Sequence, residues 1–138
     1  MPPRPFVRSP RPVPSYPPPV ALDSPAVSQE TVAWVRGQSL ADFHALPEGT
    51  LAQYFDGEVL MSPAPLFQRQ RVLADLQHAL SQFVRERDLG QVLASPLDVT
   101  LSDSLVVQPD LVFISHEREG IVTRRGLSGA PDLVAEVL

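Results

Sequence analysis

The chain has 138 residues, enough for one small domain, and it has no cysteine, which excludes disulfides, thiolate nucleophiles and thiolate zinc sites. Its formal net charge is −5 and every basic residue is an arginine, so charge alone argues against a protein held on nucleic acid by its basic surface. The sequence contains neither an apolar run long enough to span a membrane nor a recognisable signal peptide. We therefore expect a cytoplasmic protein without a membrane partner.

The first segment of the chain differs in composition from the rest. Ten of the sixteen prolines fall within the first 25 residues, and Arg4, Arg8 and Arg11 lie between them. Such a segment cannot bury a core, so we predict that residues 1–27 form a disordered or polyproline-II tail. Residues 28–138 are then the folded domain, and this part is more acidic than the chain as a whole.

Two local patterns open the predicted domain. Ser39 is a candidate N-cap for a short helix that stops at Pro47. Asp56-Gly57 lies between two β-prone runs and predicts a hairpin, because a tight turn of this kind needs positive φ at both central residues.

A long amphipathic helix is predicted next, over residues 66–89, with Gly90 as its stop. Apolar residues recur in it at spacings of three and four, which predicts one core-facing stripe. That stripe comprises Val72, Leu73, Leu76, Leu80, Phe83 and Val84.

Three strand candidates follow, at residues 91–101 (bent or split at Pro96), 106–115 and 131–138. In the last two, both sets of alternate positions are apolar, which is typical of strands covered on both faces. The pattern predicts an α/β (α+β) fold, a mixed β-sheet flanked by helices. Because the chain ends at Leu138 inside a predicted strand, we expect the domain to be incomplete at its C-terminus.

Three acids stand where strands are expected to be apolar: Glu58, Asp110 and Glu136. If the last two strands are neighbours, Asp110 and Glu136 can face one another, and two such anions repel unless a proton or a cation lies between them. Mg²⁺ accepts carboxylate oxygens and water, so one hypothesis is an ion held by Asp110 and Glu136, with Glu58 as a third ligand or water-orienting group. The other is that ordinary core hydrogen bonds satisfy each acid.

Four segments in series, "YFDGEVLMSPAP", "QRVLADLQHAL", "ASPLDVTLSDSLVVQPDLVFIS" and "GAPDLVAEVL", resemble the putative restriction endonuclease family of the PD-(D/E)XK nuclease superfamily over residues 39–138. The resemblance implies a restriction-endonuclease-like fold and hydrolysis of DNA phosphodiesters with Mg²⁺, or Mn²⁺ in its place. It assigns the Pro-Asp step to Asp110, the second metal-binding acid to Glu136 and the acid of the hairpin block to Glu58. Asp98 also recurs in the pattern, either as a ligand or as a residue of the fold.

The chain departs from the family pattern in its basic residues. The lysine expected two residues after Glu136 is Leu138, and Arg69 stands where a histidine is common. Unless Arg69 or Arg71 reaches the site, we expect this chain alone to be weakly active or inactive. A dimer or the tail arginines could supply contacts to DNA phosphates.

Two alternatives remain open from the sequence. One is a non-catalytic nuclease-fold remnant that acts as an interaction module. The other is a metal hydrolase whose substrate is not nucleic acid.

Overall fold

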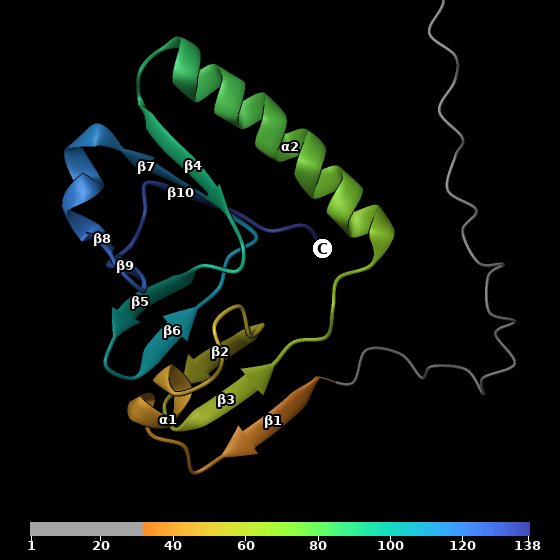
Figure 1. Cartoon of the computed structure of the whole chain (residues 1–138), viewed down its shortest axis with the longest axis vertical. Coiled ribbons are helices and arrows are strands. Elements are labelled where there is room, and N and C mark those ends of the chain that lie inside the picture. The colour runs from red at the N-terminus through yellow and green to blue at the C-terminus, as the bar shows by residue number, and fades with distance from the viewer. Residues whose placement is uncertain (1–31) are drawn as a thin grey trace, which may run out of the picture.

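The computed structural model describes residues 32–138 (Figure 1). The predicted tail, residues 1–27, lies outside the described residues. Within the described part, neither helix is both long and apolar enough to cross a bilayer.

The N-terminal part is three antiparallel strands and a short helix. It comprises β1 (Ala33–Arg36), α1 (Leu40–His44), β2 (Ala52–Phe55) and β3 (Glu58–Met61), with β3 between β1 and β2 in the sheet. The predicted N-cap is confirmed, because the Ser39 hydroxyl accepts from the Asp42 N–H and the Asp42 carboxylate accepts from the Ser39 N–H. The predicted hairpin turn is also confirmed, with φ of 41° at Asp56 and 88° at Gly57. Strand β1 was not predicted.

The long helix α2 (Phe67–Glu86) has the predicted position but not the predicted burial. Leu73 and Val84 are buried, whereas Val72, Leu76 and Phe83 are 53%, 39% and 48% exposed. Half of the predicted stripe therefore faces away from the core, because the described residues cover only one side of the apolar face.

The predicted helix stop at Gly90 is wrong. The left-handed residue after α2 is Asp88, with φ 50°, and Gly90 already begins the next strand. Gly90 has φ 145°, and a Cβ built on it would lie 2.0 Å from the carbonyl oxygen of Ile114, so glycine is required by the close approach of two strands.

The C-terminal half is composed mainly of strands. They are β4 (Gly90–Ala94), β5 (Asp98–Ser102), β6 (Leu105–Val107), β7 (Leu111–Ser115), the 3₁₀ helix η1 (His116–Ile121), β8 (Val122–Thr123), β9 (Gly126–Ser128) and β10 (Leu133–Ala135). The candidate strand at 91–101 is split at Pro96, as its sequence allowed.

The strands form two sheets rather than one. A seven-stranded sheet has the order β1-β3-β2-β6-β5-β9-β8, and a three-stranded sheet has the order β10-β7-β4. All pairs are antiparallel except β5 with β9, so the predicted mixed sheet architecture is confirmed. Helix α2 packs along β4 (Figure 1).

The predicted strand at 106–115 is divided between the two sheets. Its first part is β6 in the larger sheet, its second part is β7 in the smaller one, and Gln108, Pro109 and Asp110 form the passage between them. Since proline cannot donate a ladder hydrogen bond, Pro109 stands where pairing has to stop.

Strand β10 is less covered than predicted. Leu133 is 43% exposed and Val134 is 53% exposed, whereas Leu111, Val112 and Ile114 of β7 are buried. The prediction of two-sided burial is right for β7 and wrong for β10, because β10 lies at the edge of its sheet.

Candidate active site

Asp110 and Glu136 are brought together by the pairing of β7 with β10. The two strands are antiparallel, with Leu133 opposite Phe113, Val134 opposite Val112 and Ala135 opposite Leu111. Continuing this register by one residue places Glu136 opposite Asp110. The predicted adjacency of the two strands is therefore confirmed.

A guanidinium group lies between the two carboxylates. Arg69, in the first turn of α2, donates from Nη2 to Asp110 Oδ2 at 2.8 Å, and the same nitrogen lies 4.0 Å from Glu136 Oε2. The Val137 N–H also donates to Asp110 Oδ2, at 2.9 Å. The two acids can face each other because the guanidinium of Arg69 contacts both of them.

The two carboxyls respond to this environment in opposite directions. Burial tends to raise the pKa of Asp110, but the hydrogen bonds from Arg69 and from the Val137 N–H outweigh it and hold that pKa below its usual value. Burial and then the neighbouring charge of Asp110 raise the pKa of Glu136 above its usual value. Asp110 is therefore the stable anion of the pair, and Glu136 gains most from an additional cation.

The two acids line a pocket of about 240 Å³, which we name the acid pocket. Six parts of the chain meet around it: the start of β2, the segment after β3, the first turns of α2, the turn between β4 and β5, the passage between β6 and β7, and the segment after β10. The chain reaches residue 138 beside the first turns of α2 (Figure 1). Further polar groups on the pocket wall come from Gln53, Ser62, Ser95 and Gln108.

The donor set of the acid pocket suits a hard cation. All its uncharged polar side chains and both acids offer oxygen, and Mg²⁺ is usually held by one or two carboxylates with water and substrate oxygens in the remaining positions. Burial and the neighbouring charge of Asp110 raise the pKa of Glu136, and Arg69 offsets only part of this effect. Asp110 and Glu136 are the residues that would hold the ion. Among residues 32–138, no three acids and histidines cluster in a way that could hold a metal by themselves.

The structure does not bring Glu58 to this pocket. Glu58 begins β3 at the turn end of the hairpin, where its Oε1 lies 3.0 Å from Nε of Arg36. The opposite end of β3 leads to Ser62, which does line the acid pocket. The role predicted for Glu58 stays a prediction, and the contacts seen here give it no support.

Asp98 and Gln108 have structural contacts that the sequence did not indicate. Gln108 donates from Nε2 to Asp98 Oδ1 at 2.8 Å and to the Thr50 carbonyl at 3.1 Å, and its Oε1 accepts from the Ala52 N–H at 3.2 Å. These bonds tie β6 to β2 and β5 immediately before Pro109. A polar residue at the end of an apolar run was the only sequence signal for this role.

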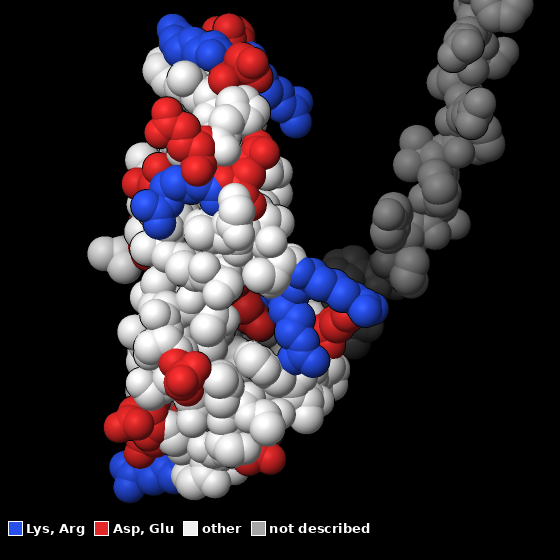
Figure 2. Space-filling model, turned by 90° about the vertical axis from the view of Figure 1, so that its left-hand side faces the viewer, with Lys and Arg blue, Asp and Glu red and all other residues white. Residues whose placement is uncertain are grey.

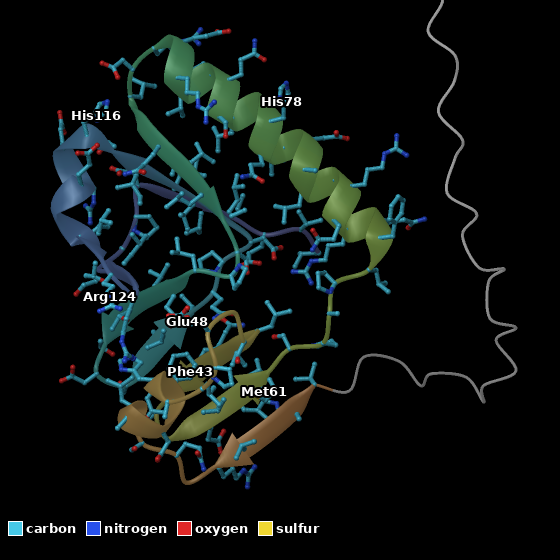
Figure 3. The ribbon with its side chains drawn as sticks, viewed as in Figure 1. Phe43, Glu48, Met61, His78, His116 and Arg124 are labelled. Carbon is cyan, nitrogen blue, oxygen red and sulfur yellow. The ribbon has the colours of Figure 1, made fainter. Side chains whose placement is uncertain are left out.

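The histidines lie on three separate elements. His44 ends α1, His78 lies on α2 and His116 begins η1 (Figure 3). None of the three lines the acid pocket of the described chain. The candidate ligands there are consequently oxygen atoms.

Comparison with known proteins first defines the class. The fold is similar to that of a protein from Anabaena variabilis described as a "putative nuclease belonging to DUF820", with a TM-score of 0.60 and 19% sequence identity. The match covers 73% of this chain and 58% of that chain, so this chain spans somewhat more than half of the length of that protein. The two proteins therefore share a mixed α+β fold.

The sequence then gives the family. Residues 40–138 match the Uma2 family, described as "Putative restriction endonuclease", and the chain belongs to that family. Restriction-endonuclease-like proteins generally use divalent metal ions. No curated protein shows significant similarity to the chain.

Proposed function

We propose that this chain is a divalent-metal-dependent nuclease domain that hydrolyses phosphodiester bonds of DNA at the acid pocket. The observation that carries the proposal is the contact of Arg69 with both Asp110 and Glu136. The contact places a cationic side chain beside two candidate metal ligands. The family motif expects its cationic residue, a lysine, at position 138, where this chain has Leu138. Family membership supports a nucleic acid as the substrate.

Each protein group has a defined task in this proposal. Asp110 and Glu136 would hold Mg²⁺ or Mn²⁺, which when bound polarises the scissile phosphate and lowers the pKa of a water molecule. Arg69 stabilises the negative charge that develops on the phosphate, because its guanidinium can donate to two oxygens at once. Unlike a lysine, it cannot give up its proton, so its contribution is electrostatic only.

The position of Arg69 also sets a condition on activity. In the described structure its guanidinium is 2.8 Å from Asp110, within the space that a shared cation would use. Binding of the ion therefore requires Arg69 to turn from the carboxylates toward the phosphate. Its side chain is 43% exposed, which leaves room for that movement.

A second candidate function is supported by the same ion pair and by α2. If Arg69 serves permanently as the counterion, the acids are satisfied without metal, and the chain is a non-catalytic nuclease-fold remnant. The exposed apolar side chains of α2, Val72, Leu76 and Phe83, would then contact another protein.

Nicking of supercoiled plasmid with Mg²⁺ or Mn²⁺ separates the two candidates. We expect the wild-type chain to nick DNA and Asp110→Asn to lose the activity. Asp103→Asn, the same chemical change at an exposed position in the turn between β5 and β6, is the matched control and retains it. Equal nicking by wild type and Asp110→Asn, or none by either, contradicts the nuclease proposal.

A further inference from the structure

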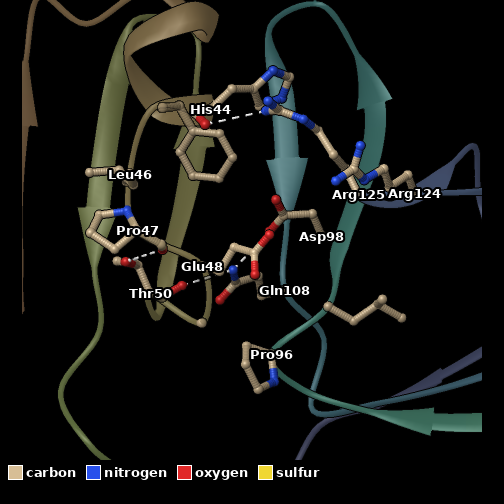
Figure 4. Close-up of a pocket in the computed structure, with 13 residues that line it drawn as sticks. His44, Leu46, Pro47, Glu48, Thr50, Pro96, Asp98, Gln108, Arg124 and Arg125 are labelled. Atoms are coloured by element: carbon tan, nitrogen blue, oxygen red, sulfur yellow. Dashed lines mark hydrogen bonds between the residues drawn. The ribbon is translucent and has the colours of Figure 1, made fainter.

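Another pocket of the described chain lies elsewhere and is larger than the acid pocket. It has a volume of about 600 Å³ and is bounded by the segment after α1, the start of β5, the end of β6 and the turn between β8 and β9 (Figure 4). We name it the arginine pocket after Arg124 and Arg125, which line it. Nothing in the acid-pocket chemistry uses these two residues.

The basic wall of the arginine pocket is built on a fixed turn. Thr123 Oγ1 donates to the Gly126 carbonyl at 3.0 Å and accepts from the Arg125 N–H at 3.3 Å. Arg125 donates from Nη1 to the His44 carbonyl at 3.2 Å, which holds its guanidinium over the end of α1. Arg124 is exposed and makes no hydrogen bond or ion pair within residues 32–138.

The turn is also held close to the floor of the pocket. Gly126 pairs with Asp98 in the parallel ladder of β9 with β5, and a Cβ on Gly126 would lie 2.2 Å from the Asp98 carbonyl oxygen. The glycine thus permits a backbone approach that sets the two arginines directly beside Asp98. The spacing between basic wall and acidic floor is a consequence of the sheet itself.

The floor and the opposite wall offer acceptors rather than donors. Asp98 Oδ1 accepts from Gln108, and its other carboxylate oxygen has no hydrogen-bond partner in the described chain. Glu48 lies across the pocket from Arg124, and its side chain makes no hydrogen bond or ion pair within residues 32–138 (Figure 4). On the face drawn in Figure 2, basic and acidic side chains likewise lie side by side, with uncharged surface around them.

The two pockets adjoin one another. Pro96 and Gln108 line both of them. A nucleic-acid strand whose scissile phosphate lies at Asp110 would therefore pass over these two residues into the arginine pocket.

We propose that the arginine pocket binds a nucleotide that flanks the scissile phosphate, with Arg124 and Arg125 on a phosphate and with Asp98 and Glu48 accepting from the amino group of a base. Arginine matches the geometry of phosphate oxygens, and carboxylates accept from amino groups such as N4 of cytosine. A free phosphate would meet both acids as well as both arginines, whereas a nucleotide carries an anionic and a donor group together. This inference rests on the proposed nuclease function and names how its substrate strand is held.

Binding without cleavage tests the inference. Fluorescence anisotropy of labelled oligo-dC and oligo-dT, measured with the full chain in the absence of divalent metal, reports binding affinity without cleavage. We expect tighter binding of oligo-dC, because thymine has no amino group. Arg124→Gln should weaken binding of both by about tenfold and lower the slope of log affinity against log salt by about one. Arg85→Gln, at an exposed arginine in the last turn of α2, is the matched control and should change neither.

Two further variants and one further ligand complete the test. Asp98→Asn and Glu48→Gln should reduce the preference for oligo-dC over oligo-dT while leaving the binding of oligo-dT unchanged or stronger. Oligo-rC measured beside oligo-dC shows whether DNA or RNA is the better-held strand, since the two share phosphate and cytosine. Equal effects of Arg124→Gln and Arg85→Gln, or equal binding of oligo-dC and oligo-dT by the wild type, would overturn the inference. Failure of plasmid nicking with intact oligonucleotide binding would instead count against the nuclease proposal alone.

Discussion

The acid pocket and the arginine pocket hold similar groups in opposite states. In the acid pocket one arginine already contacts two carboxylates, so part of their charge is offset within the chain. In the arginine pocket Arg124, Arg125, Glu48 and Asp98 form no ion pair with one another. The first site must be opened by a ligand that displaces Arg69, whereas the second is ready for a ligand that carries both signs. Under the two proposals, catalysis and substrate binding belong to separate pockets.

The largest effect should come from separating the two roles by single substitutions. Asp110→Asn should lower the nicking rate by about 10²–10³-fold, because it removes charge at the point where the metal and the phosphate meet, but it should leave oligonucleotide affinity in the absence of metal almost unchanged. Arg124→Gln should do the reverse, raising KM with little change in kcat. Plasmid nicking and anisotropy measured on both variants check this. A common loss of both properties in either variant would mean that the pockets do not act separately.

Each pocket is supported by a strand pairing that requires a glycine, so a substitution at that glycine tests the stability of one pairing at a time. Gly90→Ala should destabilise the β4–β7 pairing that supports the acid pocket, and Gly126→Ala the β5–β9 pairing that supports the arginine pocket, each by about 2–4 kcal/mol through backbone strain and overlap with a carbonyl. Urea unfolding measures the free energy. Gly120→Ala is the control, because no atom lies within 4 Å of a Cβ built there, and it should fall within about 0.5 kcal/mol of the wild type. Neutral behaviour of Gly90→Ala would contradict the strand approach described here.

Metal should stabilise the acid pocket in a pH-dependent way. At a Mg²⁺ concentration ten times its Kd, the free energy of unfolding should rise by about 1.4 kcal/mol, and Asp110→Asn should abolish the gain. The pKa of Glu136 is higher in the folded chain than in the unfolded chain. Without metal, ionised Glu136 therefore lowers the free energy of unfolding as pH rises from the pKa of the unfolded chain through that of the folded chain. The increase in the free energy of unfolding on adding Mg²⁺ should become larger over the same pH range. In Glu136→Gln this increase should no longer depend on pH. Thermal unfolding scans with and without Mg²⁺ measure both; a gain independent of pH would exclude Glu136 as a ligand.

Replacing Arg69 tests whether it competes with metal. Arg69→Gln should lower the free energy of unfolding by about 1 kcal/mol without metal, because two facing acids lose their shared cation. The same variant should gain more from Mg²⁺ than the wild type does, while its nicking rate falls. Arg71→Gln, at an exposed arginine two residues further along α2, is the control for both measurements. A variant that gains nothing from Mg²⁺ favours the remnant over the nuclease.

The smallest effect concerns a charge group outside both pockets. His116 contacts Glu119 at 2.8 Å and Asp88 at 3.0 Å, and the hydrogen bonds to Glu119 and then Asp88 raise its pKa. Its stabilising contribution is complete below the unfolded pKa of histidine and is lost as pH rises through the raised folded value. His116→Gln should remove this slight dependence in thermal scans while leaving the Mg²⁺ gain and oligonucleotide affinity intact. A change in either would show that η1 communicates with the pockets.

The sequence predicted elements whose signals are local. The hairpin turn follows from Asp56-Gly57, because only a few residues adopt positive φ readily, and α2 follows from its apolar spacing. The break at Pro109 follows from the missing N–H. Strand β1 was missed because a four-residue run gives no periodic signal.

The site was predictable in part. Pro-Asp and the later acid indicated Asp110 and Glu136, and the absent lysine drew attention to Arg69. That Arg69 reaches Asp110 depends on how α2 docks 41 residues away in the chain, which no local pattern encodes. Arg124 and Arg125 lie in the turn that leads into β9, and their place in the arginine pocket follows from the parallel pairing of β9 with β5, which no local pattern encodes.

Gln108 forms part of the wall of both pockets. Its amide is the partition between two compartments, and three hydrogen bonds hold that partition upright. Shortening it by Gln108→Ala would merge the compartments and release the backbone that leads into Asp110. A single substitution at Gln108 would therefore alter the walls of both pockets at once.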